Sequence, residues 1–342
     1  MNIIHRNFFR LLRAGIFGTE EQIEPMSVWK WRQVYGIAVQ QSVAPLLYDG
    51  IKACSSQFVM QMPDDMHRQW HDVAAATRQR NLQASRETAE LLTVLGSLQF
   101  RPFVVESWIA ACHYPVPEHH FTEGVNIFFP YDTQRNKANE WAKVNGSQPD
   151  DSHKHLLRYT WKSLRVEHRR FILHLNSRPG NMTLQNIIEQ ERLEGGNATV
   201  SIDGQRFETV GPTLTMLVAL LAVVKASLSE GLHLWQIADM GMLLRSQGDR
   251  VDFVKLQAWI ERLHCTRMAQ LVGSVLTSLL GFSTDEIPFV PASKLNSDAD
   301  DVIDSLFDSK THSSGRFFRY HPGESIASVV ANITHRLGNV EE

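Results

Sequence analysis

The 342-residue sequence has few of the residues that build several common kinds of site. It contains three cysteines, Cys54, Cys112 and Cys265, which are far apart and include no Cys-x-x-Cys pair. Neither a disulfide framework nor a zinc knuckle is therefore indicated, and each cysteine is expected to be a small buried apolar residue. The sequence also lacks the serine-hydrolase, zinc-protease, phosphate-binding-loop and dinucleotide-binding motifs, so no common enzyme signature is present.

Long apolar runs and an excess of either charge are missing as well. The longest apolar run, Leu214–Val224 with Thr215 inside it, is too short to cross a bilayer and predicts a buried helix. The first residues lack the unbroken apolar region of a secretory signal, so a cytoplasmic protein without membrane contact is expected. With 34 Lys and Arg against 37 Asp and Glu, the net charge of -3 gives no attraction to nucleic acid.

What is present falls into four consecutive stretches. Helical periodicity dominates residues 1–98, and short apolar or alternating runs typical of strands fill an α/β core at 99–210. Helical patterns return at 211–292, and 293–342 is interpreted as a partly mobile tail with a final helix. The sequence thus predicts an α+β fold, in which a small mixed sheet is flanked by N- and C-terminal helical regions.

Within this order, a long helix is expected at about 64–97, and six short runs in the core are expected to be strands. Asp203-Gly204 is a strong signal for a two-residue hairpin between the last two runs. Another antiparallel pair is expected between Tyr159 and Leu175, with its turn near Glu167-His168. The six runs are 103–105, 125–129, 159–166, 170–175, 199–202 and 206–209.

Five short stretches occur in a recognisable order. They are Leu11–Gly15, Val43–Ile51, the strand–helix–strand stretch Phe103–Phe129, Phe171–His174 and Leu232–Met240. In order and pattern they resemble a bacterial family of largely uncharacterised nucleotidyltransferases, often met with genes for cell-surface polysaccharide. The resemblance covers most of residues 8–280 and implies a nucleotidyltransferase fold for the α/β core.

An active nucleotidyltransferase of that fold holds two metal ions with carboxylates. The metals neutralise the triphosphate and align the attacking hydroxyl with the leaving pyrophosphate. Two carboxylates come from an Asp-x-Asp on one strand, where the one-residue gap puts both side chains on one face. A third comes from a neighbouring strand. Mg²⁺ with a nucleoside triphosphate is therefore implied for this chain only if it is active, and no other cofactor is expected.

Six positions of this chain match the family's site. They are Glu106, Ser107, Gly124, Asn126, Ile172 and His174. Glu106-Ser107 falls where the family's first strand ends in Lys-Gly, and Gly124 and Asn126 fall where the family has Asp-x-Asp. Ile172 falls on the third acid, beside a retained His174. The resemblance therefore implies a degenerate member without metal ligands, which binds a nucleotide, a sugar precursor or sugar phosphate, or a protein partner.

Two other functions are kept as alternatives. An active transferase with a rewired acidic site would use Glu106 and Glu123, with Asp132 or His174 in support. A weaker alternative is an RNA-binding module built on the basic stretch 153–170, although its alternating pattern favours a solvated sheet face.

Further candidate residues lie outside these positions. His113, His119 and His120 are close in sequence and of a type that suits a transition metal, but a histidine-bearing surface loop is the favoured interpretation. Asp239 lies among apolar residues of a predicted helix. Because a buried carboxylate needs a partner, Asp239 is expected to lock the C-terminal helices onto the core. Glu123, His120 and Asp239 are thus added as candidate cleft residues.

Overall fold

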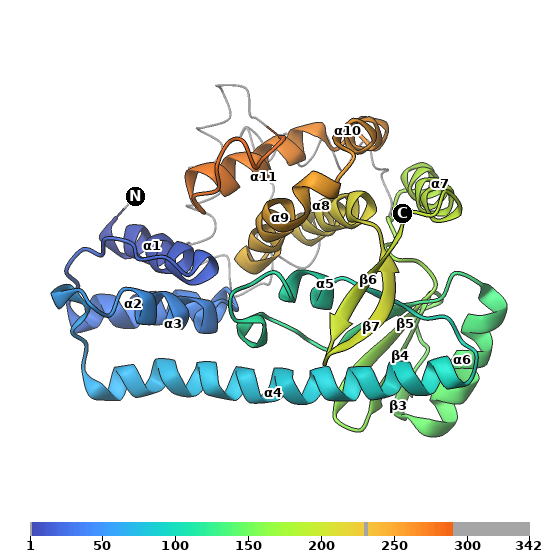
Figure 1. Ribbon diagram of the computed structural model, residues 1–342, viewed down its shortest axis with the longest axis horizontal. Coiled ribbons are helices and arrows are strands. Elements are labelled where there is room, and N and C mark those ends of the chain that lie inside the picture. The colour runs from blue at the N-terminus through green and yellow to red at the C-terminus, as the bar shows by residue number, and fades with distance from the viewer. Residues whose placement is uncertain (1, 229–231, 290–342) are drawn as a thin grey trace.

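A computed structural model describes residues 2–228 and 232–289, and the fold is given for these. The chain begins with a group of helices beside which one long helix, α4, extends. Figure 1 shows that α4 runs along one side of the molecule, from the N-terminal helices to the sheet. The expected helix at 64–97 is confirmed. The N-terminal helices are α1 (Ile3–Phe17), α2 (Val28–Gln40), α3 (Ala44–Ala53), the short η1 (Phe58–Met60) and α4 (Asp64–Ser97).

A seven-stranded mixed sheet follows, with strand order β3-β4-β5-β2-β1-β7-β6. The central strand β2 pairs antiparallel with β1 and parallel with β5, and β1 pairs parallel with β7. The strands are β1 (Phe103–Val105), β2 (Val125–Phe128), β3 (Ser147–Asp150), β4 (Leu156–Trp161), β5 (Leu164–Arg169), β6 (Asn197–Ile202) and β7 (Gln205–Val210). The helices between them are α5 (Ser107–Ala111), η2 (Pro117–His119), α6 (Asp132–Asn145) and α7 (Arg178–Leu193).

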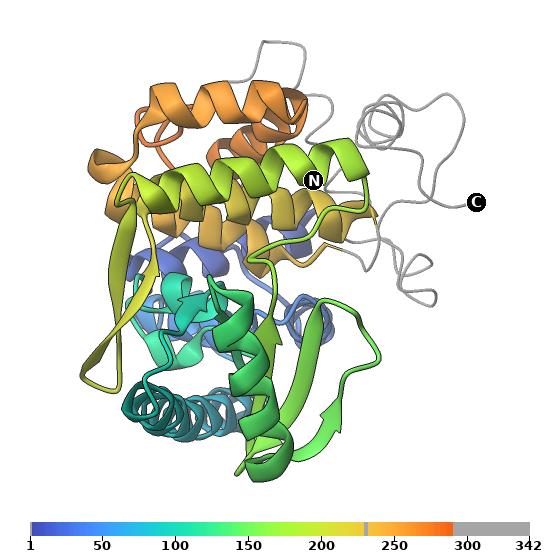
Figure 2. The same ribbon diagram turned by 90° about the vertical axis from the view of Figure 1, so that its right-hand side faces the viewer.

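The C-terminal helices lie on the other side of the sheet from α4, as Figures 1 and 2 both show. They are α8 (Pro212–Leu228), α9 (Leu234–Gln247), η3 (Gly248–Arg250), α10 (Phe253–Arg262) and α11 (Thr266–Ser278). The mixed α/β architecture with flanking helices confirms the predicted α+β class. The predicted tail at 293–342 and its final helix lie outside the described residues.

The two faces of the sheet have different partners because successive side chains of a strand point to opposite sides. Val104, Val125 and Val166 point to the face that packs against α4 and α6. Val105 and Phe128 point to the other face and join the core that contains the C-terminal helices. The polar side chains described below lie on this second face, so the alternation of the strands places them between sheet and helices.

Helices α1–α3 of the N-terminal region and α8–α11 of the C-terminal region share one hydrophobic core. Within it α1 and α3 meet backbone to backbone. A Cβ added at Gly15 would lie 1.9 Å from the Leu46 carbonyl oxygen, and one at Gly50 would lie 1.9 Å from the Leu11 carbonyl oxygen. Only glycine fits at both crossings, which explains why these two residues lie inside helices.

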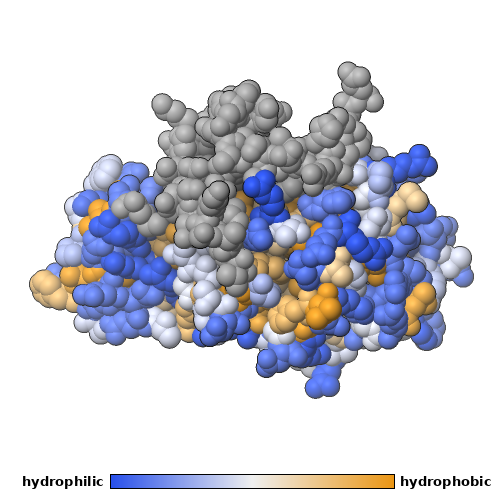
Figure 3. Space-filling view, turned by 90° about the horizontal axis from the view of Figure 1, so that it is seen from above, coloured by the Kyte–Doolittle hydropathy of each residue, from blue (hydrophilic) through white to orange (hydrophobic). Residues whose placement is uncertain are grey.

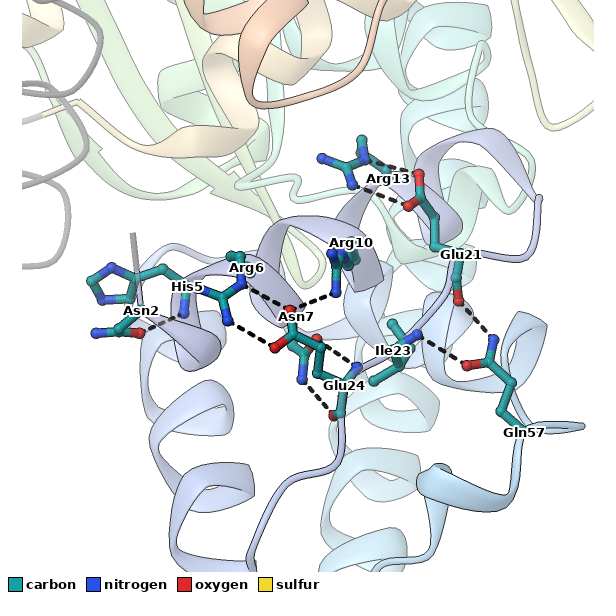
Figure 4. Close-up of polar contacts among 10 residues, drawn as sticks. All are labelled: Asn2, His5, Arg6, Asn7, Arg10, Arg13, Glu21, Ile23, Glu24 and Gln57. Carbon is teal, nitrogen blue, oxygen red and sulfur yellow. Dashed lines mark hydrogen bonds and ion pairs between the residues drawn. The ribbon is translucent and has the colours of Figure 1, made fainter.

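Ion pairs hold the segment after α1 back against that helix (Figure 4). Arg6 and Arg10 both contact the Glu24 carboxylate, at 2.7 and 2.8 Å, and Arg13 contacts Glu21 at 2.9 Å. Hydrogen bonds from Arg6 are the main cause that lowers the pKa of Glu24 to about 2. These contacts explain the arginines that interrupt the apolar stripe of α1: they bind the next segment.

The predicted position of the turn between β4 and β5, near Glu167-His168, was wrong. The turn lies at Lys162-Ser163, and Glu167 and His168 lie inside β5. Lys162 adopts a positive φ of 57°, a conformation usually signalled by Gly or Asn, and neither is present here. The run at 170–175, expected to be the second strand, follows the end of β5 and forms bends instead.

Neither helix α7 nor strand β3 was predicted. Helix α7 begins after Ser177, whose hydroxyl accepts a hydrogen bond from the Gly180 N–H, and it buries Leu184, Ile187 and Ile188. This spacing is a helical signal that was present in the sequence. Strand β3 is exposed along its whole length and carries polar residues, so it has no hydrophobic alternation to reveal it.

Two of the three cysteines are buried as expected, and the third is not. Cys54 and Cys265 are buried, whereas Cys112 is exposed. The short helix α5 turns residues Ile109 and Ala110 into the core, and Cys112 follows at its C-cap. An apolar neighbourhood in sequence therefore did not give burial at this position.

The face in Figure 3 is largely hydrophilic where it is coloured, and its apolar patches are small and separate. Scattered apolar side chains are normal on a protein surface and need no partner to explain them. Within residues 2–228 and 232–289, none of the helices combines the length and the apolar content needed to span a membrane.

Candidate functional site

A cavity of about 410 Å³ lies between the second face of the sheet and helices α8 and α9. Its volume falls in the range of small-molecule sites, roughly 300–1,000 Å³. Several positions singled out from the sequence line it together. They are Glu106, Glu123, Ile172, His174 and Asp239.

The strand register determines which residues face this cavity. Asn126 on β2 lies opposite Val105 on β1 and opposite Glu167 on β5. Glu167 and Arg169 share a face of β5 because they are two residues apart, and both line the cavity. The carboxylate beside Asn126 is therefore Glu167. Ile172, where the third acid was expected, is buried beyond the end of β5.

Arg169 joins two carboxylates in the cavity. Its Nη1 lies 2.5 Å from Glu106 Oε1, and its Nη2 lies 2.9 Å from Glu167 Oε2. Arg158 Nε donates to the other Glu167 oxygen at 2.8 Å, and Asn126 Nδ2 donates to Glu106 Oε2 at 2.6 Å. The two acids are thus neutralised by two arginines, with the Arg169 guanidinium between them.

The pKa shifts of Arg169 and Glu167 both favour the charged form of the side chain. Burial lowers the pKa of Arg169, but Glu106 and Glu167 outweigh it, so the pKa is raised above its ordinary value. Burial raises the pKa of Glu167, but Arg169 and Arg158 outweigh it, so that pKa is lowered. Each shift favours the charged form, which is the form that ion pairing stabilises.

Glu106 also has an unusual backbone. Its φ of 65° and ψ of -131° belong to a region that residues other than glycine rarely occupy. In an active enzyme of this fold, a glycine-containing turn after the first strand lets the backbone approach phosphates. Here a carboxylate side chain stands at that turn. Ser107, the next residue, begins α5, and its side chain lies outside the described part of the chain.

Gly124 cannot be replaced by an acid without a backbone shift. Its φ is 143°, and an added Cβ would lie 2.2 Å from the Arg165 carbonyl oxygen. Its own carbonyl accepts a hydrogen bond from Trp108 Nε1 at 3.1 Å. The local packing of β2 and β5 therefore excludes the first aspartate of an Asp-x-Asp.

The residues present do not fit the pair of metal ions that the fold implies. Gly124 has no side chain, and the Asn126 amide is bound to Glu106. Glu123 is exposed where it lines the cavity, while Glu106 and Glu167 bind Arg169. Among the described residues, no group of three or more His, Cys, Asp or Glu side chains is arranged to hold a metal.

The opposite wall of the cavity contains a buried polar cluster. Asp239 on α9 accepts hydrogen bonds from the Tyr114 hydroxyl at 2.7 Å and pairs with His120 Nε2 at 2.8 Å. Burial, and then the nearby Asp239, raise the pKa of Tyr114 well above its usual range. The partner expected for Asp239 is therefore present, and it ties α9 to the loop between α5 and β2.

The three histidines of that loop have different partners and do not converge. His119 Nδ1 contacts Asp49 Oδ2 at 2.7 Å, and the His113 ring contacts the Gln247 amide. The favoured surface-loop interpretation was wrong for His119 and His120, which are 5% and 0% exposed. Each is buried by a contact with a distant helix, α3 or α9, which a local reading of the sequence does not show.

Acidic partners bind much of the basic stretch at 153–170. Besides Arg158 and Arg169, Lys162 pairs with Glu90 and Arg170 pairs with Asp132. His168 is buried, where it donates to Asn139 and accepts from the Tyr159 hydroxyl. The stretch therefore differs from the continuous basic surface that RNA binding favours.

The comparison with family models agrees with the sequence resemblance. The model of a family described as uncharacterised nucleotidyltransferase matches residues 28–281. A search of curated proteins found no match. Among solved structures, an antigenic nucleotidyltransferase-like protein from Paracoccidioides brasiliensis is similar, with 14% identity and a TM-score of 0.37. The similarity covers 62% of this chain and 95% of that one.

Proposed function

The chain belongs to the family of uncharacterised nucleotidyltransferases, and from this membership and its cleft chemistry we propose a catalytically degenerate member that binds without transferring. The ligand is a nucleotide or a sugar phosphate, held without a divalent metal. The observation that supports this function is the position of Arg169, between Glu106 and Glu167.

The physical reason is competition for the same oxygens. Nucleotidyl transfer needs clustered anionic oxygens that hold metals against the triphosphate. In this cleft the oxygens of Glu106 and Glu167 already accept hydrogen bonds from a guanidinium. A metal at that point would have to displace Arg169 and leave its charge partly buried without partners, which is unfavourable.

The resemblance to a bacterial family also suggests a setting for the ligand. It suggests a protein that works beside the synthesis of cell-surface polysaccharide. A nucleotide sugar or its sugar-phosphate precursor suits that setting and the cavity volume of about 410 Å³. If none of the small molecules below binds, a protein partner that binds in the same cleft is the next candidate ligand.

A transferase with a rewired acidic site is the second candidate. It is favoured by two observations: Glu106 and Glu167 contact the same guanidinium, and Glu123 lines the same cavity. If Arg169 swung away in a complex, these acids would be the donors available to a metal. Such an enzyme would bind nucleoside triphosphates with Mg²⁺ and release pyrophosphate.

Isothermal titration calorimetry with the four nucleoside triphosphates, UDP and UDP-glucose separates the two candidates. Each compound is titrated once with Mg²⁺ and once with EDTA, and pyrophosphate release is assayed in parallel. The degenerate binding protein is expected to bind at least one compound equally well in EDTA and to release no pyrophosphate. Saturable binding that requires Mg²⁺, with pyrophosphate release, contradicts the proposal.

A further inference from the structure

One edge of the cavity carries a pair of histidines that the Arg169 network does not use. His155 precedes β4, and His174 follows β5; both line the cavity. Their rings are stacked, with centroids 5.0 Å apart and an interplanar angle of 27°. Phe171 contacts both rings, at 5.0 and 5.4 Å, and the Arg170 guanidinium lies over Phe171. The two imidazoles are therefore fixed in position by aromatic contacts.

The ring nitrogens of this pair are available to hydrogen-bond with a ligand. His155 Nδ1 is buried and has no hydrogen-bond partner. Within the described residues, neither the His155 ring nor the His174 ring hydrogen-bonds to another group of the protein. A buried polar atom without a partner is unfavourable, so a ligand that supplied one would gain from this site.

The charges around the two rings are mostly positive. They come from every element packed here: Lys154 before β4, Arg158 on β4, Arg170 after β5, Arg135 and Asp132 on α6, and Lys225 on α8. Asp132 is bound to Arg135 and Arg170, and Arg158 is bound to Glu167. The charged side chains that act most strongly on the two rings, Arg170, Lys154 and Arg135 on His155 and Lys225 on His174, are all positive.

The ring pKa values respond to this environment. Burial, and then Arg170, Lys154 and Arg135, lower the pKa of His155. Burial, and then His155 and Lys225, lower the pKa of His174. A group that carried negative charge would reverse the electrostatic part of both shifts and favour ring protonation.

A second cavity, of about 210 Å³, shares His155 and Leu156 with the larger one. Its lining includes Arg135, Lys143 and Lys154. His155 therefore lies where the larger cavity, lined by both apolar and charged side chains, meets a smaller and more basic one. A ligand with an anionic end and a less polar body matches this arrangement.

We propose that the stacked His155–His174 pair is a phosphate-binding subsite at the edge of the cleft. It takes the phosphoryl or diphosphoryl group of a ligand, whose remaining part lies in the larger cavity. Ring N–H groups donate to phosphate oxygens, and the surrounding Arg and Lys side chains supply charge without a metal. This inference rests on the proposed function and names the chemical group that the cleft binds.

Inorganic pyrophosphate is the probe for this subsite, titrated calorimetrically in EDTA into the full chain. His155→Gln and His174→Gln are each expected to weaken pyrophosphate binding about tenfold, because each removes a charge-assisted hydrogen bond. His71→Gln is the matched control. The His71 side chain lies on α4, is 57% exposed and forms an ion pair with the neighbouring Asp72 carboxylate. This variant is expected to bind as the wild type does.

Two further readouts separate a binding role from a structural one. The imidazole NMR signals of His155 and His174 are expected to move toward their protonated positions when pyrophosphate binds. Affinity is expected to rise from pH 8 to pH 6. UDP, titrated beside pyrophosphate, shows whether a nucleoside in the larger cavity adds to the affinity of the diphosphate alone.

Unchanged affinity in both histidine variants, or imidazole signals that do not move, overturns the subsite. If nucleotides then still bind in EDTA, the proposed function stands and only this inference fails. A tenfold loss in the histidine variants supports the subsite even if the wild-type protein releases pyrophosphate with Mg²⁺, a result that would overturn only the proposed function.

Discussion

Among single residues, Arg169 has the strongest bearing on the proposed function, because it binds two of the carboxylates that line the cleft, Glu106 and Glu167. Arg169→Met leaves these acids partly buried without a cation and is expected to destabilise the protein by about 3 kcal/mol. Arg170→Met is the matched control. Its partner Asp132 is 56% exposed, so that loss should stay below about 1 kcal/mol. Urea unfolding of both variants measures the difference. Equal losses in the free energy of unfolding would show that the Arg169 ion pairs stabilise the protein no more than the exposed Arg170 pair does.

The backbone of Glu106 gives a prediction of its own. Glycine adopts its positive φ without strain, whereas alanine does not. Glu106→Gly is therefore expected to be more stable than Glu106→Ala by about 1 kcal/mol, the reverse of the usual order. Both variants lose the same carboxylate, so their comparison isolates the backbone term. A glycine variant that is the less stable of the two in thermal unfolding would refute the assigned strain.

His168 makes stability depend on pH in a defined direction. Burial lowers its pKa to about 3, from an ordinary value of 6.5. Between these values the unfolded chain binds a proton that the folded chain does not. Stability should therefore fall as the pH drops below about 6.5, by about 1.4 kcal/mol per unit from this residue.

Urea unfolding at pH 7 and pH 5 measures this contribution. His168→Gln is the comparison, since glutamine does not titrate and the other histidines are unchanged in it. The variant is expected to be less stable at pH 7, because it loses the hydrogen bonds to Tyr159 and Asn139, but to lose less stability on acidification. Parallel stability losses in wild type and variant would contradict the assigned pKa.

At the scale of elements, the close backbone contact between α1 and α3 gives the strictest test of the helical packing. Gly50→Ala places a Cβ 1.9 Å from the Leu11 carbonyl oxygen, so the two helices must separate. A loss of about 3 kcal/mol or more is expected from overpacking at a backbone contact. Gly96→Ala in α4 meets no atom within 4 Å and should stabilise the protein by about 1 kcal/mol. Thermal unfolding of the pair checks both signs, and a tolerated Gly50→Ala would contradict the described crossing.

The elements also show what the sequence could predict. The hairpin of β6 and β7 was found because Asp203-Gly204 adopts the positive φ values that this dipeptide favours. The turn of β4 and β5 was missed because Lys162 adopts a positive φ without a sequence signal. Because of that error, Glu167 was expected in the turn and Arg169 after it, although both lie in β5. Glu106 and Asn126 could be located from the sequence, but their partners could not, since cross-strand neighbours depend on register.

At the scale of the whole molecule, the cleft lies between the sheet and the C-terminal helices. Hydrophobic residues outside the charged network hold these two parts in place. One core joins the N- and C-terminal helices, and another fixes the sheet to α4 and α6. Neither core contains the charged side chains of the cavity. The fold can therefore be kept while the cleft residues change, which is consistent with a family member whose site differs from that of an active enzyme.

The most direct test of this account is a Mn²⁺ titration of the wild-type protein, followed by electron paramagnetic resonance, with and without a nucleoside triphosphate. Because Arg169 lies between Glu106 and Glu167, the protein is expected to bind no Mn²⁺ in the cleft beyond what the free nucleotide holds. Stoichiometric Mn²⁺ binding that is lost in Glu106→Gln or Glu167→Gln would show that these acids hold a metal, and would contradict the account.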